Sequence, residues 1–334
     1  MLGYDSRAQR GIIRPASGWS DVIDHLPTPE GVSTGAAQAL RSLLDRASAL
    51  RAEGREAEAI ACGPDILRAY FHVEQGRPHD RETPCTFTDK IYCRMLDVHE
   101  RGCATYARLS DKLAVRDHVA QRIGERFITP VLWSGDDAAA IPWHQLPGEF
   151  VLKCNEGSGK GLLVLPSQDR EAARALAAAW LAESFYWRKR EYHYWQVPRR
   201  LLAEPRLDDG HPDGPIDYIF HCFDGVPRLL QVGSRSHTIH RFFTPDWEPL
   251  ELTYRKHYLA PPMPRPAALG QMLDIAATLS SGFDFVRVDL YGCGNEVRFG
   301  ELTFTPCAGR VMFQPREWDA RAGEWWRYAG LPDG

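Results

Sequence analysis

Two short segments near the end of the chain place acidic and basic side chains at a spacing that suits metal and phosphate chemistry. Arg287 and Asp289 lie two residues apart in one alternating run, and Glu301 and Thr303 lie two apart in the next. Because side chains alternate across a β-strand, each pair shares a face. Two carboxylates with a hydroxyl suit Mg²⁺, which binds one or two carboxylates together with substrate phosphates. The neighbouring guanidinium can hold a phosphoryl oxygen in bidentate fashion.

Both pairs reach one site only if the two runs form a hairpin of suitable register. The runs cover 283–291 and 296–304, so the connection from Gly292 to Asn295 must have an odd effective length or the hairpin must contain a bulge. The glycines in this connection make either arrangement feasible. An amphipathic hairpin with a solvated charged face fits the same pattern, so the metal site is a hypothesis at this point.

A glycine-rich loop is the second candidate. Lys153 ends a short apolar strand, and the following loop carries Gly157, Ser158 and Gly159. Such a loop brings backbone N–H groups and an ammonium close to phosphates. The spacing is not that of a Walker A motif, and an ordinary glycine-rich hairpin turn is the alternative. Glu156 would repel a triphosphate unless its side chain faces away.

Lys112 is the third candidate. The pattern predicts a helix capped by Ser110 and closed by Gly124, which puts Lys112 in the first helical turn. The helix dipole disfavours a cation there, which hints at another purpose, although an ordinary surface lysine is the alternative.

The elements that position these residues change character along the chain. Residues 1–32 are expected to form an irregular arm, and helical periodicity begins at about residue 33. Further helices are predicted at 64–74, 87–100, 110–124, 169–183 and 269–279, and strands at 150–153, 161–165, 200–204, 216–223, 226–232, 283–291 and 296–304. Strands in adjacent pairs, broken by helices, predict an α+β fold with antiparallel sheets.

Composition excludes several classes of protein. The 334 residues carry a net charge of −4, so no overall basic field favours nucleic acid as a partner. No apolar run is long enough to predict an integral membrane protein or a signal peptide. The eight cysteines form no CxxC pair, which favours reduced thiols and a cytoplasmic location.

Taken together, the chain resembles the TupA-like branch of the ATP-grasp superfamily, named for a protein of teichuronopeptide synthesis. The resemblance extends from about residue 87 to 318. It is carried by the order and spacing of the segments 109–116, 146–155, 190–194, 202–204, 217–218, 221–225, 287–291 and 299–306. The resemblance implies the ATP-grasp fold, with ATP held between two α+β lobes and Mg²⁺ as metal.

The resemblance also implies roles for individual residues. Lys112 and Lys153 match the two lysines that bind ATP, and Gly157 to Gly159 match the flexible loop over the phosphates. Glu204 and Leu207 match the hinge that binds adenine, and Asp217 matches the acid that binds ribose. Asp289, Glu301 and Thr303 match the metal site, and Arg287 matches the arginine that steadies the transferred phosphoryl group. The expected divisions are 1–85 (arm and helices), 86–147 (helical part), 148–207 (lobe with the loop) and 208–334 (lobe with the metal site).

Three positions depart from the family pattern. Thr303 stands where many ATP-grasp enzymes have asparagine, which weakens the case for a second metal. Glu156 stands where relatives usually have histidine, and Ile219 where they have lysine. The last two changes remove a basic group near the expected site and put the substrate in question.

The expected function is an ATP-dependent carboxylate–amine ligase that works through an acyl-phosphate. The resemblance points to an amino acid and a uronic acid as the small-molecule substrates, in surface polysaccharide biosynthesis. Arg235 and Arg241 are candidates for holding the carboxylate substrate, with surface arginines as the alternative. A small-molecule or sugar kinase and a nucleotide-binding protein without turnover are rival functions. The sequence does not fix the oligomeric state.

Overall fold

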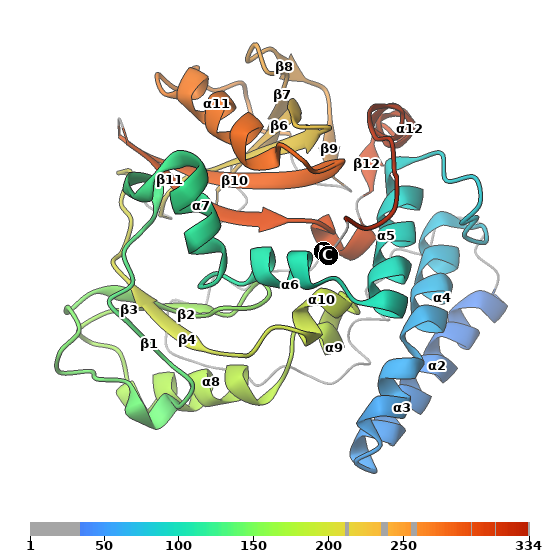
Figure 1. Ribbon diagram of the computed structural model, residues 1–334, viewed down its shortest axis with the longest axis horizontal. Coiled ribbons are helices and arrows are strands. Elements are labelled where there is room, and N and C mark those ends of the chain that lie inside the picture. Colours follow the sequence, from blue (N-terminus) through green and yellow to red (C-terminus); the bar gives the residue numbers. More distant parts are fainter. Residues whose placement is uncertain are drawn as a thin grey trace.

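The computed structural model describes residues 34–210, 214–234, 240–254, 259–294, 296–310 and 312–332, so the predicted arm lies outside the described residues. A six-stranded and a four-stranded antiparallel sheet occupy opposite ends of the molecule, with short helices between them and a helical group at one side (Figure 1). The predicted α+β class is confirmed. Within the described residues no helix combines the length and apolar character needed to cross a membrane.

The described helices follow the predicted order. They are α2 Thr34–Ala52, α3 Glu56–Ala61, α4 Gly63–Gln75, α5 Phe87–Arg101, α6 Ala104–Ser110, α7 Val115–Ile123, α8 Arg170–Ala182, α9 Tyr186–Lys189, α10 Tyr192–Trp195, α11 Leu269–Ser280 and α12 Glu317–Trp325, with 3₁₀ turns η2 Glu125–Phe127, η3 Ala138–Ala140 and η4 Pro306–Gly309.

The described strands also follow the predicted order, with short strands added. They are β1 Trp133–Gly135, β2 Phe150–Cys154, β3 Gly161–Val164, β4 Leu201–Glu204, β5 Asp217–Phe223, β6 Val226–Gly233, β7 His240–Phe243, β8 Pro249–Leu250, β9 Thr253–Tyr254, β10 Phe285–Cys293, β11 Glu296–Thr303 and β12 Phe313–Gln314.

The helix predicted for 110–124 begins in the wrong place. Ser110 is the last residue of α6, and the next helix begins only at Val115. The backbone leaves the helical conformation at Asp111, whose φ is −78° and ψ is 116°, and the Asp111 carboxylate accepts a hydrogen bond of 2.8 Å from the N–H of Leu113. Lys112 therefore lies in a turn between two helices, and the helix dipole imposes no penalty on it.

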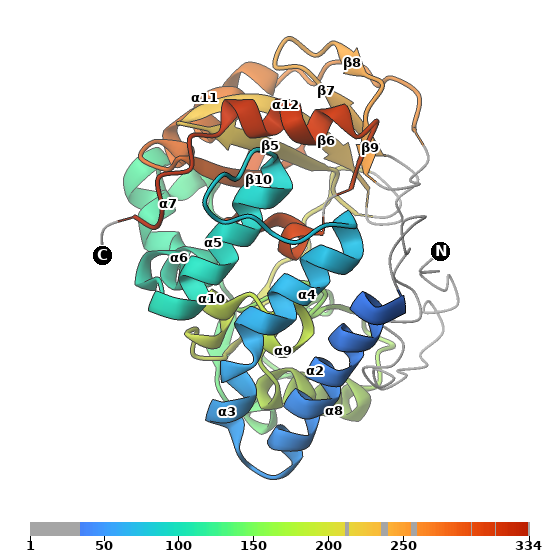
Figure 2. The same cartoon turned by 90° about the vertical axis from the view of Figure 1, so that its right-hand side faces the viewer.

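The N-terminal helices pack on the rest of the chain. The apolar stripe of α2, including Leu40, Leu44 and Ala47, is buried in the same core as α4 and α5. The α2 helix therefore packs on the core of this chain. The opposite edge of α5 meets α12 (Figure 2), where the Lys90 ammonium donates to the carbonyls at the end of α12.

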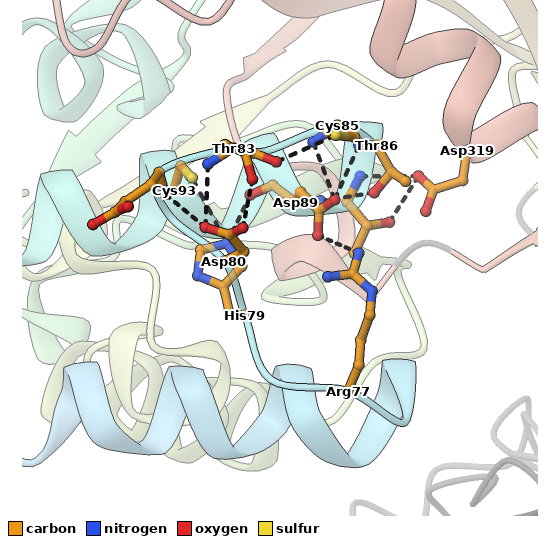
Figure 3. Close-up of polar contacts among 11 residues, drawn as sticks. Arg77, His79, Asp80, Thr83, Cys85, Thr86, Asp89, Cys93 and Asp319 are labelled. Carbon is orange, nitrogen blue, oxygen red and sulfur yellow. Dashed lines mark hydrogen bonds and ion pairs between the residues drawn. The ribbon is translucent and has the colours of Figure 1, made fainter.

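The loop between α4 and α5 is held by a polar network around Asp89 (Figure 3). Thr86 and Asp89 form a capping box at the start of α5. The guanidinium of Arg77 lies 2.6 Å from the Asp89 carboxylate, and the Thr88 hydroxyl donates to Asp319 over 2.9 Å. These contacts join the N-terminal helices to α5 and α12, so the network has a structural role.

The six-stranded sheet has the order β11-β10-β5-β6-β7-β8. One face is apolar and is covered by α11, with Val286, Val288 and Leu290 of β10 in this core. On the other face the first part of β10 packs under α5 and α12, while its later part carries polar side chains. Arg94 of α5, fully buried, donates to the carbonyls of Phe285 and Phe304 at 2.9 and 3.0 Å, which ties this hairpin to the helical group.

The four-stranded sheet has the order β1-β4-β2-β3, with α8 packed on one face. The end of β2 and the start of its antiparallel neighbour β4 lie towards the short helices that separate the two sheets (Figure 1). The described part of the chain therefore brings the loop after β2 towards the polar half of the β10–β11 hairpin.

Candidate active site

The β10–β11 hairpin has the register that strand parity required. Asp289 lies opposite Glu301, and Arg287 lies opposite Thr303. The register shifts directly after Asp289, because Gly300 is an extra residue in β11. A Cβ at position 300 would lie 2.9 Å from the Asp289 carbonyl oxygen, so the bulge requires glycine. The bulge brings both carboxylates to the same face.

Arg287 connects the two carboxylates. Its Nε and Nη2 donate to the two oxygens of Asp289 over 2.8 and 2.6 Å, and Nη2 also donates to Glu301 over 2.9 Å. The Thr303 hydroxyl donates to the same Glu301 oxygen over 3.1 Å. The four side chains predicted from the alternating pattern thus form one cluster, in which Arg287 is held in a fixed orientation.

The two predicted ATP lysines lie near this cluster. The Lys112 ammonium is 3.7 Å from Glu301 and donates to the Gly157 carbonyl over 2.7 Å. Lys153 donates to Glu204 over 2.7 Å. Although burial opposes the change, Lys112 and Arg287, with a smaller effect from Lys153, lower the pKa of Glu301. Both lysines therefore converge on the same region from separate segments of the chain.

Burial acts differently on the second carboxylate. It raises the pKa of Asp289 to about 7, since the adjacent Arg287 only partly offsets the loss of water and the neighbouring Glu301 adds to the rise. A divalent cation between the two carboxylates would favour their charged forms. Binding of such a cation would therefore lower the pKa of Asp289.

The residues present fit Mg²⁺. Among the described residues no group of three or more His, Cys, Asp or Glu side chains could hold a metal. Asp289 and Glu301 instead supply two carboxylates, with the Thr303 hydroxyl beside them. Mg²⁺ commonly takes one or two protein carboxylates and completes its shell with phosphate oxygens and water. The pair is therefore suited to a metal that arrives with a nucleotide.

The glycine-rich loop also fits a phosphate-bearing ligand. Gly157 and Gly159 have φ values of 73° and 72°, which only glycine adopts without strain. Gly157 is buried against Phe185, whereas Ser158 and Gly159 are exposed. The loop thus has an anchored base and an open tip.

Glu156 does not face the phosphate region. Its carboxylate is fully buried, accepts hydrogen bonds of 3.1 and 3.0 Å from the Phe185 N–H, and pairs with the Lys160 ammonium. Lys160 also donates to the carbonyls of Trp180 and Glu183 at the end of α8. The departure at position 156 therefore anchors the loop and adds no negative charge to the open site.

The expected nucleotide residues lie at the ends of β4 and β5. Glu204 ends β4, where it also lies 3.6 Å from Arg116, a cation that sequence patterns did not single out. Leu207 follows it and is half-buried. Asp217 begins β5 and pairs with Tyr291, on the same sheet face as Asp289. Their roles in nucleotide binding stay predictions.

The sheet neighbours of the cluster are less polar than expected. Ile219, the second departure, is buried beside Asp289 on β5, and His221 lies beside Arg287. Burial lowers the pKa of His221 to about 3, so the imidazole is neutral at pH 7. The loss of a basic group at position 219 is therefore a change at the site itself.

The structure does not bring Arg241, one of the two candidate substrate arginines, to the cluster. Arg241 pairs with Val232, whose side chain belongs to the core under α11, on the opposite face from Asp289. Its guanidinium donates to Ala260 and to Glu251 over 3.0 and 2.6 Å. Arg235 lies outside the described residues.

Glu191 belongs to the segment 190–194 that carries the family resemblance, but the sequence assigned it no role. This acid lies directly before α10, is buried, and accepts a hydrogen bond of 2.5 Å from the Thr305 hydroxyl. The sequence signal for a role was its position in the aromatic-rich segment 185–195. An acidic side chain among aromatic residues is either exposed to solvent or buried with a specific hydrogen-bond partner.

The fold and the cluster of lysines, arginine and paired carboxylates define the class of ATP-grasp proteins. The model of the TupA-like ATP-grasp family matches residues 89–327, and the chain belongs to this family. The family predicted from the sequence is thereby confirmed. No curated protein sequence matches the chain.

Several solved ATP-grasp structures are similar to the chain at low identity. D-alanine–D-alanine ligase from Bacillus anthracis, complexed with ATP, is 12% identical over 60% of this chain and 54% of its own, with a TM-score of 0.37. The Helicobacter pylori D-alanine–D-alanine ligase is 15% identical over 67% and 60%, with a TM-score of 0.40. The ligase PsnB, complexed with a minimal precursor, is 14% identical over 65% and 56%, with a TM-score of 0.34. This chain thus spans between 54% and 60% of these three proteins.

Proposed function

We propose that this protein is an ATP- and Mg²⁺-dependent carboxylate–amine ligase that forms an amide through an acyl-phosphate. One observation supports the proposal above all: Asp289 and Glu301 face each other across the bulged hairpin, and Arg287 bridges them from the same face. Family membership supports the same chemistry. The proposed lobes are those predicted, 148–207 with the loop and 208–334 with the metal site.

The residues of the chain bind and orient the reactants. Lys112 and Lys153 neutralise the phosphates, the loop tip at Ser158 covers them, and Asp289 and Glu301 hold the metal. Mg²⁺, when bound with ATP, neutralises charge on the transferred phosphoryl group. The Arg287 guanidinium then steadies the phosphoryl oxygens and the oxyanion that forms as the amine adds. No protein nucleophile is needed.

Glu204, Leu207 and Asp217 are proposed to hold the adenosine part of ATP, with Thr303 as an auxiliary ligand of the metal. The finer identity of the substrates is also a proposal. We infer a uronic acid and an amino acid as substrates, used in the cytoplasm for surface polysaccharide biosynthesis. Support for these substrates comes from the family alone. The site itself adds none, because the buried Ile219 stands where relatives have a lysine.

Hydroxylamine trapping tests the reaction class. The full-length protein is incubated with ATP, Mg²⁺, hydroxylamine and a panel of uronic and amino acids, and the hydroxamate, ADP and phosphate are measured. A ligase yields all three for at least one carboxylate. A phosphorylated acceptor without hydroxamate identifies a kinase and refutes the proposal, as does the absence of turnover across the panel. Asp289→Asn is the matched control and should yield no hydroxamate above background.

A further inference from the structure

Glu191 is a buried carboxylate between the two sheets that the proposed ligase chemistry does not yet use. It precedes α10, which lies beside α6 between the sheets (Figure 1), and its side chain has one hydrogen-bond donor among the described residues, the Thr305 hydroxyl. Thr305 follows the end of β11 by two residues, and Thr303 at that end pairs with Arg287. Glu191 is thus connected to the strand that carries the proposed metal site.

Three cations act on Glu191: Lys189 at the end of α9, Arg310 after η4, and Arg287 on β10. The uncharged Thr305 donates its hydrogen bond. No lysine, arginine or histidine of the described residues approaches its oxygens within 4.0 Å, in contrast to Glu156 and Glu204. Burial therefore outweighs these favourable influences and raises the pKa of Glu191 to about 7.

The contact with Thr305 places this carboxylate near the reacting groups, because Thr305 lies two residues beyond Thr303, whose hydroxyl donates to Glu301. Tyr194, three residues after Glu191, is also buried, and burial together with the nearby Glu191 charge raises the pKa of its hydroxyl. A carboxylate that is half-protonated near neutral pH is suited to accept a proton there.

We infer that Glu191 is the general base that deprotonates the incoming ammonium group, an inference that rests on the proposed ligase reaction. The carboxylate takes one proton from R–NH₃⁺. The freed lone pair of nitrogen forms the C–N bond, and the C–O bond to the phosphoryl group breaks with its electrons on the leaving phosphate. The phosphate carries away the second nitrogen proton, and Glu191 returns the first to solvent.

The test compares two nucleophiles with the full-length protein and its Glu191→Gln variant. Hydroxylamine is largely uncharged at pH 7 and needs no base, whereas amino acids are ammonium ions. With a carboxylate found by hydroxamate trapping, the variant should form amide about a hundredfold more slowly, as expected for loss of a general base, while hydroxamate formation falls by less than about tenfold. In the wild-type protein, amide formation should rise with pH through about 7. That acidic limb should be absent in the variant.

The Thr305→Val variant supplies an independent measurement. Its loss of the hydrogen bond that lowers the pKa of Glu191 should move the acidic limb of the amide profile to higher pH while leaving the base in place. Three results for the Glu191→Gln variant would each overturn the inference. They are an equal loss of amide and hydroxamate, an unchanged rate of amide formation, and an unchanged pH profile. Hydroxamate without amide from any amine in the wild-type protein would also overturn it while preserving acyl-phosphate formation. Absence of hydroxamate refutes the proposed function itself.

Discussion

Replacing Lys160 with methionine should destabilise the protein and loosen the glycine-rich loop. The Lys160 and Glu156 side chains are 6% and 0% exposed, and the pair spans the loop from both ends. Removing one partner of a buried ion pair typically costs about 3–5 kcal/mol. Because Glu156 keeps its bonds to the Phe185 N–H, we expect the lower end, about 3 kcal/mol.

The expected change is large enough to measure. An unfolding entropy of about 2.1 cal/mol/K per residue gives about 0.7 kcal/mol/K for 334 residues, so a loss of about 3 kcal/mol lowers Tm by about 4 °C. ATP affinity should fall as well, because the loop loses its anchor. Thermal and urea unfolding give the stability, and nucleotide titration gives the Kd.

A double-mutant cycle with Glu156→Gln separates the ion pair from a simple packing loss. The double variant has no unpaired buried charge, so it should be more stable than Lys160→Met alone, with a coupling of about 2 kcal/mol. A Lys160→Met protein within about 0.5 kcal/mol of wild type, or costs that simply add, would refute the assigned role of the pair.

Three further outcomes are expected. Lys153→Ala should weaken ATP binding by about ten- to a hundredfold in calorimetric titration, since a charge-assisted hydrogen bond contributes about 1.5–3 kcal/mol, and unchanged affinity would contradict its role. Asp289→Asn should lower kcat on the order of a thousandfold with a cooperative melt retained; near-normal turnover would exclude the metal assignment. Gly157→Ala should be much less stable than Gly159→Ala. The backbone φ is similar at the two positions, but a Cβ at 157 would lie 2.4 Å from the Phe185 side chain, whereas position 159 is open. Equal Tm values for the two variants would contradict this.

The hairpin at the site was predictable because strand alternation is local. Arg287 and Asp289, like Glu301 and Thr303, share a face whatever the rest of the fold does. The relation between the two pairs required either a turn of odd length or a bulge, and the bulge at Gly300 is the solution found. The sequence shows that one of these two arrangements is needed. Which of them forms depends on contacts between the strands, which the residue pattern of a single strand does not show.

Predictions failed where a residue's neighbours are distant in sequence. Ser110 is an exception with a local cause: it ends one helix because the backbone leaves the helical conformation at Asp111, whose carboxylate accepts a hydrogen bond from the Leu113 N–H. For Glu156 the sequence left open whether the side chain faces the phosphates, because its contact with the Phe185 N–H depends on tertiary packing. Glu191 was missed for the same reason, since its hydrogen-bond donor lies 114 residues away.

Arg94 has a consequence for the order in which the chain folds during synthesis. Its partners, the carbonyls of Phe285 and Phe304, lie 191 and 210 residues further along the chain. Domains translated first generally begin to fold first, so α5 leaves the ribosome long before the hairpin that satisfies this buried cation exists. The nascent helical group must keep Arg94 solvated until residue 304 emerges. The hairpin that carries the proposed metal site can therefore dock on α5 only after residue 304 has emerged.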